Sequence, residues 1–280
     1  MTMKQKNADR YRLLLIAVVA ILYIFPFLWM VSNSFMSEKN IFSVPPKFIP
    51  DLLFTDQVFD NYKEVFTQYN FGRYTINSLL VYALAAFGQI LVCSLAGFAL
   101  STMHFKGKNL IFSLLIFTLM IPVQVTIIPE YYLFLKLNWM DTYLPLIVPS
   151  FLAGAFGTFM LKEFFAQVPR PLFDAGIIDG VNAYQMFARI YLPQASSPIA
   201  TLFIIAFMNN WNDLLRPMLY ISSRKLYTVT IALSQFQNQY GVKWNLLLAG
   251  SVLSVLPLLI IFAFSQRYII ESTMNTGIKG

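Results

Sequence analysis

Charged side chains are scarce in this chain: only 12% of its 280 residues are Asp, Glu, Lys or Arg, whereas 58% are hydrophobic. A water-soluble domain normally carries about a quarter charged residues. A soluble core could not hide this much apolar surface, and the mean hydropathy is +0.62. The composition therefore excludes an ordinary soluble domain and predicts that the solvent of this protein is lipid.

Cysteine and histidine are almost absent. Cys93 is the single cysteine and His104 the single histidine. One cysteine cannot form an intrachain disulfide, so the fold does not depend on an oxidising compartment. No group of residues has the spacing of metal ligands or of a nucleophile with its base. We therefore predict no catalytic site, no metal and no cofactor in this chain, and we do not expect it to be an enzyme.

Charge is also missing from the middle of the apolar runs. The nearest charged residues, Glu130, Asp213 and Arg216, lie at or close to the outer ends of the runs. Charges at mid-bilayer cost about 2.5–3.5 kcal/mol on insertion scales and persist mainly for function, for example in ion-driven carriers. The chain also lacks G-x-x-x-x-G-K-[ST], so it cannot hold ATP phosphates in a P-loop. Energy for uphill transport would have to come from a partner.

Six apolar runs are each long enough to cross a bilayer, which takes about 20 residues. Helix is expected because lipid satisfies no backbone polar group and the runs lack barrel-type alternation. We predict an all-α polytopic fold, a single transmembrane domain over residues 1–280, with prolines such as Pro122 causing kinks rather than breaks. Glycines such as Gly97 and Gly157 predict close helix contacts. The predicted spans are 13–31, 76–101, 110–128, 143–161, 198–219 and 246–264.

The distribution of Lys and Arg predicts the orientation. With a cytoplasmic N-terminus, the inner segments carry a net charge of +6 and the outer segments +1. Because basic residues collect on the cytoplasmic side, both termini are expected inside a bacterial cytoplasmic membrane. The first run could also be a secretory signal peptide, but its apolar part is too long and we favour a retained helix. Residues 164–195 then lie in the cytoplasm and residues 219–245 outside.

The polar segment 164–195 is too long and too regular for an ordinary connector. It contains two stretches with apolar residues at helical spacing, separated by Asp179-Gly180. Asn182 with Gln185 forms a capping-box pattern, Gly180 suits a sharp turn, and Leu192-Pro193 ends the second stretch. This pattern predicts a helix–turn–helix that docks on a partner through its exposed acids.

Residues 174–180, DAGIIDG, resemble the "EAA" loop of permease subunits of ABC importers, and the ending Ile190-Tyr191-Leu192-Pro193 is similar as well. The chain looks like the carbohydrate branch of that family, and most like the shorter permease of maltose-type systems. Further similar motifs are Asn77-Ser78-Leu79, Ile121-Pro122-Val123-Gln124, Trp211-Asn212-Asp213, Gln266-Arg267-Tyr268 and the terminal Gly277-Ile278-Lys279-Gly280.

The resemblance implies roles for particular positions. Gly277, Lys279 and Gly280 correspond to the tail that reaches between two ATPase subunits, which bind ATP and Mg. Gln237, Asn238, Gln239 and Tyr240 correspond to the tip of an outer loop that enters the sugar cleft of a solute-binding protein. The residues expected to couple to the ATPase are Phe173, Asp174, Ala175, Asp179, Gly180, Tyr184, Phe187, Leu192 and Pro193.

Two features qualify these expectations. Asp174 stands where the family pattern has Glu, and Gly176 stands where it has Ala, which should weaken the short helix by ~1 kcal/mol if exposed. The motif Trp211-Asn212-Asp213 suits either an interfacial anchor or a sugar pathway. The candidate pathway residues are Asn209, Trp211, Asn212 and Asp213.

These observations predict the permease subunit of an ATP-driven, binding-protein-dependent importer of a sugar or oligosaccharide. The expected partners are a second permease subunit, a dimer of ABC ATPases, an extracytoplasmic solute-binding protein, the carbohydrate and lipid, but no nucleic acid. The alternatives are an ABC permease for a sugar phosphate or peptide, an ion-driven secondary carrier or channel, and a structural scaffold.

Overall fold

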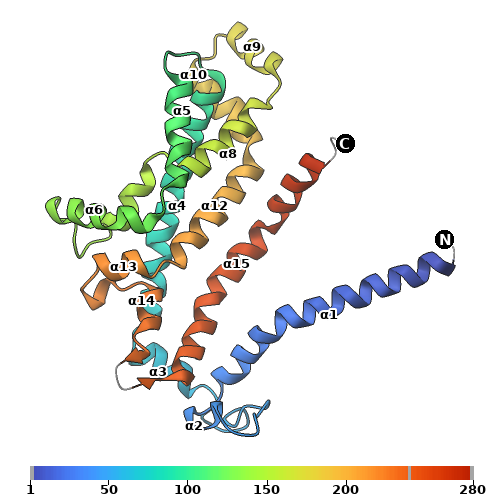
Figure 1. Ribbon diagram of the computed structural model, residues 1–280, viewed down its shortest axis with the longest axis vertical. Coiled ribbons are helices and arrows are strands. Elements are labelled where there is room, and N and C mark those ends of the chain that lie inside the picture. The colour runs from blue at the N-terminus through green and yellow to red at the C-terminus, as the bar shows by residue number, and fades with distance from the viewer. Residues whose placement is uncertain (1–2, 239–240, 278–280) are drawn as a thin grey trace. The chain divides into compact units, whose positions relative to one another are not determined.

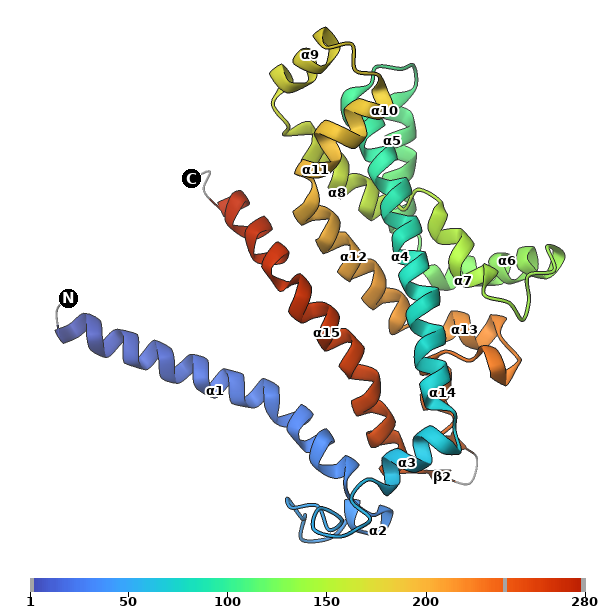
Figure 2. The ribbon, with the colours of Figure 1, turned by 180° about the vertical axis from the view of Figure 1, so that it is seen from behind.

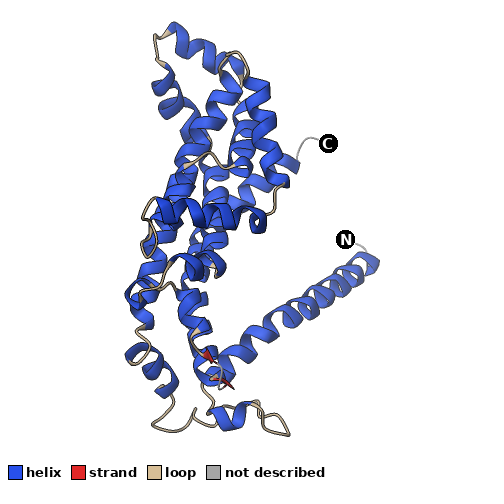
Figure 3. Ribbon diagram, turned by 60° about the vertical axis from the view of Figure 1, so that its left-hand side comes forward, coloured by secondary structure: helices blue, strands red, loops and turns tan. Residues whose placement is uncertain are grey.

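The computed structural model describes the backbone of residues 3–238 and 241–277, and the side chains of residues 10–237 and 241–266. Helices dominate, and the strands of this described part form one short ribbon (Figure 3). The predicted all-α fold is confirmed. The ribbon is an addition that the sequence analysis did not anticipate.

The elements follow one another along the chain as labelled in Figure 1. The first half contains α1 (Met3–Ser34), α2 (Glu38–Ile41), α3 (Asp60–Thr67), α4 (Phe71–Thr102), α5 (Lys108–Phe117), η1 (Thr118–Met120), α6 (Val123–Lys136), α7 (Leu144–Ile147), η2 (Val148–Phe151) and α8 (Ala155–Ala166). The second half contains α9 (Arg170–Ile178), α10 (Ala183–Gln185), η3 (Met186–Tyr191), α11 (Leu192–Gln194), α12 (Ser196–Trp211), α13 (Leu215–Tyr220), η4 (Arg224–Leu226), α14 (Val229–Ser234), β1 (Gln237–Asn238), β2 (Gly241–Val242) and α15 (Trp244–Gly277).

The chain divides into two compact units. The smaller unit combines Met1–Gly72 with Ala232–Leu256, and the larger combines Arg73–Ile231 with Pro257–Gly280. Within the smaller unit, the buried side chain of Asn61 donates hydrogen bonds to the carbonyl oxygens of Ser34 and Met36, both at 2.9 Å. Asn245 donates to Oδ1 of Asn61 at 2.8 Å. The side-chain amide of Asn61 thus connects the end of α1, helix α3 and the start of α15 by hydrogen bonds.

Helix α1 is apolar but hardly packed. In the segment Arg10–Ser34, no residue of the most apolar 18-residue stretch is buried, whereas 39% of the residues in such a stretch of α4 are buried. Side chains such as Leu14 and Tyr23 are 60% and 75% exposed. Water is a poor solvent for such a surface, so we expect lipid or other protein surface to cover it.

The larger unit is held by close contacts between helices at glycines. A Cβ added at Gly97 of α4 would lie 2.9 Å from the backbone nitrogen of Lys162 in α8. One added at Gly157 of α8 would lie 2.9 Å from Sγ of Cys93 and 3.0 Å from the side chain of Leu202 in α12. The predicted glycine-mediated contacts are therefore confirmed, and they bring α4, α8 and α12 together.

Several predicted spans are not continuous helices, which corrects the sequence analysis. The run 110–128 breaks at Ile121–Pro122, where Lys108–Met120 and Val123–Lys136 meet at 103°. The run 198–219 ends as α12 at Trp211 and resumes as α13 at Leu215. The run 143–161 is interrupted between Phe151 and Ala155, but the segment Leu144–Ala166 that contains it is still long and apolar enough to cross a membrane. Pro122 thus causes a break rather than a kink, because it lacks the N–H and restricts the residue before it.

The predicted runs 13–31, 76–101 and 246–264 fall inside α1, α4 and α15. Four helical segments are long and apolar enough to cross a membrane, or up to six if each of two bent pairs counts as one span. The second bent pair joins Ala183–Gln194 to Ser196–Trp211 at 81°. The six predicted membrane crossings stay a prediction.

The glycine contact between α4 and α8 predicts a specific cost. Gly97→Ala should destabilise the protein by about 1–3 kcal/mol, because overpacking against a helix backbone forces a shift. Gly72→Ala, also in α4, is the matched control, since its Cβ would meet the Phe66 ring at an ordinary 3.4 Å. Thermal unfolding of the purified protein measures both. A midpoint for Gly97→Ala at or above that of Gly72→Ala would contradict the inferred contact.

Candidate functional site

The predicted helix–turn–helix is present at one end of the larger unit (Figure 2). Helix α9 ends before Gly180, whose φ of +71° is the left-handed conformation that glycine adopts without strain. Asn182 then caps α10: Gln185 N donates to its side chain at 2.9 Å, and Asn182 N donates to the Gln185 side chain at 3.1 Å. The capping box and the glycine turn are both confirmed. The second helix runs one residue past Pro193, to Gln194.

Gly176 has a different role from the one expected. It is buried, and a Cβ there would lie 2.6 Å from Cε of Met186 and 3.1 Å from Cδ1 of Ile190. The glycine allows α9 to lie directly against η3. The expectation that it merely weakens an exposed helix is therefore wrong, because the position is an inter-helix contact.

The coupling residues divide into an exposed set and an inward set. Phe173 and Leu192 are half-buried. Phe187 is only 5% exposed, so it lies on the inward face of the helix pair, and its role in coupling stays a prediction. Tyr184, predicted on the same face, is 72% exposed. Phe187 lies in the π-helical stretch η3, which departs from α-helical spacing, so Tyr184 and Phe187 do not share a face. The exposed residues are Asp174, Ala175, Asp179, Gly180, Tyr184 and Pro193.

An aromatic cluster joins the inward face of this loop to the helices behind it. The Phe98 ring of α4 lies 5.5 Å from Phe187 and 5.0 Å from Tyr191, and Phe165 of α8 lies 5.8 Å from Tyr191. Burial, followed by the negative charge of Asp174, raises the pKa of Tyr191. The ring therefore stays neutral and packs as an apolar group. A motion applied to the exposed acids would pass into α4 and α8 through these rings.

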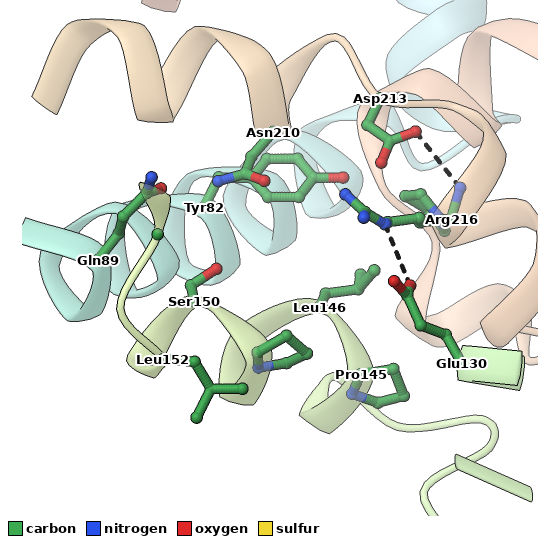
Figure 4. A pocket seen from close by; sticks show the side chains of 13 residues that line it. Tyr82, Gln89, Glu130, Pro145, Leu146, Ser150, Leu152, Asn210, Asp213 and Arg216 are labelled. Carbon is green, nitrogen blue, oxygen red and sulfur yellow. Dashed lines mark hydrogen bonds and ion pairs between the residues drawn. The ribbon is translucent and has the colours of Figure 1, made fainter. Parts of the chain in front are cut away.

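The candidate pathway residues lie around the break between α12 and α13. Asn209, Asn212 and Asp213 line a cavity of about 260 Å³. Asp213 also lines a second cavity of about 220 Å³, here named the polar pocket, together with Asn210 and Arg216 (Figure 4).

Trp211 does not reach either cavity. It is 2% exposed, and its ring lies 5.4 Å from Phe207 and 6.3 Å from Tyr82. Neighbouring aromatic rings enclose it, so its side chain does not line the candidate pathway in this structure, and the two expected roles stay predictions. It positions the end of α12.

The polar pocket contains an ion pair that the sequence did not bring together. Glu130 Oε2 of α6 lies 3.7 Å from Arg216 Nε of α13, as the dashed line in Figure 4 marks. Asp213 Oδ1 accepts hydrogen bonds from the backbone N–H groups of Leu215 at 3.0 Å and Arg216 at 3.3 Å. Further polar lining residues, missed because they come from separate segments, are Tyr82, Gln89, Ser150 and Asn210. The available signal was the polar, proline-containing interruption of apolar runs.

Asp141 holds the segment that follows α13. Its backbone N–H donates to the Tyr220 carbonyl at 2.8 Å, and its Oδ1 accepts from Ser222 N at 2.9 Å and Ser223 N at 2.7 Å. The hydroxyl and backbone N–H of Ser223 lower the pKa of the Asp141 carboxyl. The carboxylate form is thus the one that fixes α13 and, with it, Arg216.

The remaining predicted residues are only partly described. Gln237 is exposed in β1, and Asn238 pairs with Gly241 across the ribbon. Gly277 is the last residue of α15. Gln239, Tyr240, Lys279 and Gly280 lie outside the described residues. Among the described side chains, no group of three or more His, Cys, Asp or Glu could hold a metal ion.

The capping box predicts a local effect on the loop. Asn182→Ala should cost about 0.5–2 kcal/mol in helix stability, because the backbone N–H of Gln185 loses the Asn182 side-chain oxygen to which it donates. Hydrogen exchange of residues 183–191 should therefore become faster. Asn109→Ala, at an exposed asparagine in the first turn of α5, is the control. Equal protection in the two variants would show that the cap does not hold the helix.

Comparison with known proteins gives a consistent picture. The arabinooligosaccharides transport system permease protein AraQ of Halalkalibacterium halodurans is 31% identical over 267 residues, 94% of each chain. The lactose transport system permease protein LacG of Rhizobium radiobacter is 27% identical over 98% of each chain. The sn-glycerol-3-phosphate transport system permease protein UgpE of Brucella abortus is 28% identical over 94% of this chain and 95% of its own.

A solved structure has the same fold. A chain from the crystal structure of a bacterial ABC transporter involved in the import of the acidic polysaccharide alginate superposes with a TM-score of 0.80. It covers 96% of this chain and 99% of its own length at 18% identity, a level that shows the fold alone. Residues 89–274 match the family described as binding-protein-dependent transport system inner membrane component. The chain belongs to this family of multi-pass membrane permease subunits.

Proposed function

We propose that this chain is a permease subunit of an ATP-driven, binding-protein-dependent importer of a sugar or oligosaccharide, and that it forms half of the translocation pathway. The observation that carries the proposal is the helix pair α9–η3. Its outer face presents Asp174 and Asp179, while its inner face packs on α4 and α8 through aromatic rings. The relatives AraQ and LacG are named for the transport of arabinooligosaccharides and lactose, which supports a saccharide as the solute.

The mechanism is a transmitted rigid-body movement. A partner ATPase holds ATP and Mg and grips the exposed face of residues 170–185. When its two subunits close, their movement displaces the exposed face at Asp174 and Asp179. The displacement is transmitted through Phe187 and Tyr191 to the helix bundle. Because a packed core deforms little, the helices turn as a body and the pathway reorients.

The remaining partners follow from surfaces that this chain leaves uncovered. The exposed apolar side chains of α1 suit a second permease subunit and lipid. The ribbon β1–β2 suits contact with an extracytoplasmic binding protein. A solved alginate importer in complex with a periplasmic protein that carries an alginate pentasaccharide has a related fold, with a TM-score of 0.64. Both termini of this chain then lie in the cytoplasm, and the membrane is the bacterial inner membrane.

The test is charge reversal at the docking face. Asp174→Lys should leave the protein folded and inserted, because Asp174 is exposed, but should abolish ATP-dependent uptake by the reconstituted importer. The physical reason is repulsion from a basic cleft in the ATPase. Asp56→Lys, at an exposed acid between α2 and α3, is the matched control and should transport normally.

Transport and ATPase rates in proteoliposomes measure the effect. Normal uptake by Asp174→Lys would remove Asp174 from the docking contact. Uptake by this chain alone, driven by an ion gradient and indifferent to ATP, would replace the whole proposal with a secondary carrier.

A further inference from the structure

The polar pocket lies between α4, α6, the segment from α7 to α8, and the break between α12 and α13. Tyr82 and Gln89 come from the uninterrupted α4 and Glu130 from within α6, whereas the other lining residues lie in the segment from α7 to the start of α8 and around the break between α12 and α13. Interrupted helices leave backbone groups without helical partners, and in transporters such breaks commonly form the substrate site. Within a chain this apolar, a cavity lined by so many polar groups suits a polar occupant.

The polar groups of the pocket suit hydroxyl groups. Asn210, Gln89 and Ser150 can each donate and accept hydrogen bonds, and they line the cavity from three different segments. The carboxylates of Glu130 and Asp213 accept hydrogen bonds from hydroxyl donors. Donors and acceptors are thus interspersed around the space, as a polyhydroxylated ring requires.

Tyr82 supplies an independent sign of a ligand. Its side chain is 2% exposed, lines the pocket from α4, and points its hydroxyl toward the space beside Arg216 (Figure 4). Among the described residues that hydroxyl makes no hydrogen bond of standard geometry, although the hydroxyls of Thr228 and Thr230 lie close to it. A buried polar atom left unpaired costs about 1–3 kcal/mol, which a ligand hydroxyl or water at this place would remove.

The charge balance of the pocket selects among saccharides. Two acids, Glu130 and Asp213, face one base, Arg216, and Nε of that base already lies 3.7 Å from Glu130. A carboxylate or phosphate on the ligand would meet these fixed negative charges without a free cation, and like charges repel strongly where water is restricted. An uncharged ring meets no such barrier.

We propose that the polar pocket binds one ring of an uncharged sugar and that Glu130 and Asp213 exclude acidic and phosphorylated sugars. This inference rests on the proposed function and names its substrate class. The volume of about 220 Å³ is below the roughly 300–1,000 Å³ of pockets for drug-sized ligands, so it holds one ring rather than a whole oligosaccharide. The proposed solute class differs from the solutes that the names of UgpE and of the alginate importer give for those proteins.

The first experiment identifies the class of solute. The complete importer, reconstituted with its partner permease, ATPase and binding protein, is given a panel of radiolabelled lactose, arabino-oligosaccharides, glycerol 3-phosphate and uronate oligomers. Uptake of an uncharged member supports the inference. Uptake confined to a carboxylate- or phosphate-bearing member overturns it and leaves the importer function intact. Absence of ATP-dependent uptake of every member overturns the proposed function, and the inference with it.

The second experiment tests the pocket itself with the transported sugar and its C6-oxidised uronate. Binding of both probes is measured on the intact complex in nanodiscs without binding protein. Glu130→Gln removes one negative charge and frees Arg216, so the affinity for the uronate relative to the neutral sugar should rise about tenfold. Glu130→Asp keeps the charge and should keep the wild-type ratio. A merely misfolded variant would lose both probes together.

Glu38→Gln is the matched control, since Glu38 is an exposed acid in the first turn of α2, and its ratio should equal that of the wild type. A ratio for Glu130→Gln equal to that of Glu38→Gln overturns the assignment of Glu130 as a selectivity residue. Loss of both probes in Glu130→Gln, with retention in Glu130→Asp, shows that the carboxylate holds the pocket together rather than selects, and overturns it equally.

Discussion

The contact between Phe98 and the rings of Phe187 and Tyr191 is the interaction on which the larger unit depends for any transmitted motion. These rings bury the inner face of a helix pair whose outer face carries only exposed residues. Aromatic pairs contribute about 0.5–1.5 kcal/mol each beyond the area that they bury. Without them, α9 and η3 would be a loose polar connector. With them, α9 and η3 pack directly on α4 and α8, as the proposed coupling requires.

The same loop shows how close packing and backbone conformation cooperate. Gly176 lets α9 approach Met186, and Gly180 reverses the chain within one residue. Pro193 lies near the end of the second helix, and the chain then turns by 81° into α12. Each of these positions sets an angle or a distance between two helices. The loop is therefore a rigid part of the fold rather than an appended segment.

The polar pocket obeys a different constraint. Some of its lining residues, such as Asp213, lie at a helix interruption, whereas others, such as Tyr82 in α4 and Glu130 in α6, lie within helices. Asp141 fixes the end of α13 from outside the pocket through three hydrogen bonds. Close helix packing and polar cavities thus occur at different places along the same helices, an arrangement that suits the proposed transmission of motion and the proposed binding of a solute.

Much of this architecture was accessible from the sequence. The apolar composition required helices in lipid, Gly180 and the pair Asn182–Gln185 specified the turn and the cap, and Gly97 and Gly157 marked close contacts. These features depend on local backbone preferences or on residue size, both of which can be inferred from the residue types alone. The positions of Trp211 and Phe187 did not follow, because the side on which a ring lies depends on neighbouring helices and on the π-helical register of η3. Nor did the meeting of Glu130 with Arg216, which are 86 positions apart in the numbering. Local backbone preferences can be read from the sequence, whereas the meeting of Glu130 with Arg216, and with the Tyr220 hydroxyl that donates to it at 3.4 Å, depends on how the helices pack.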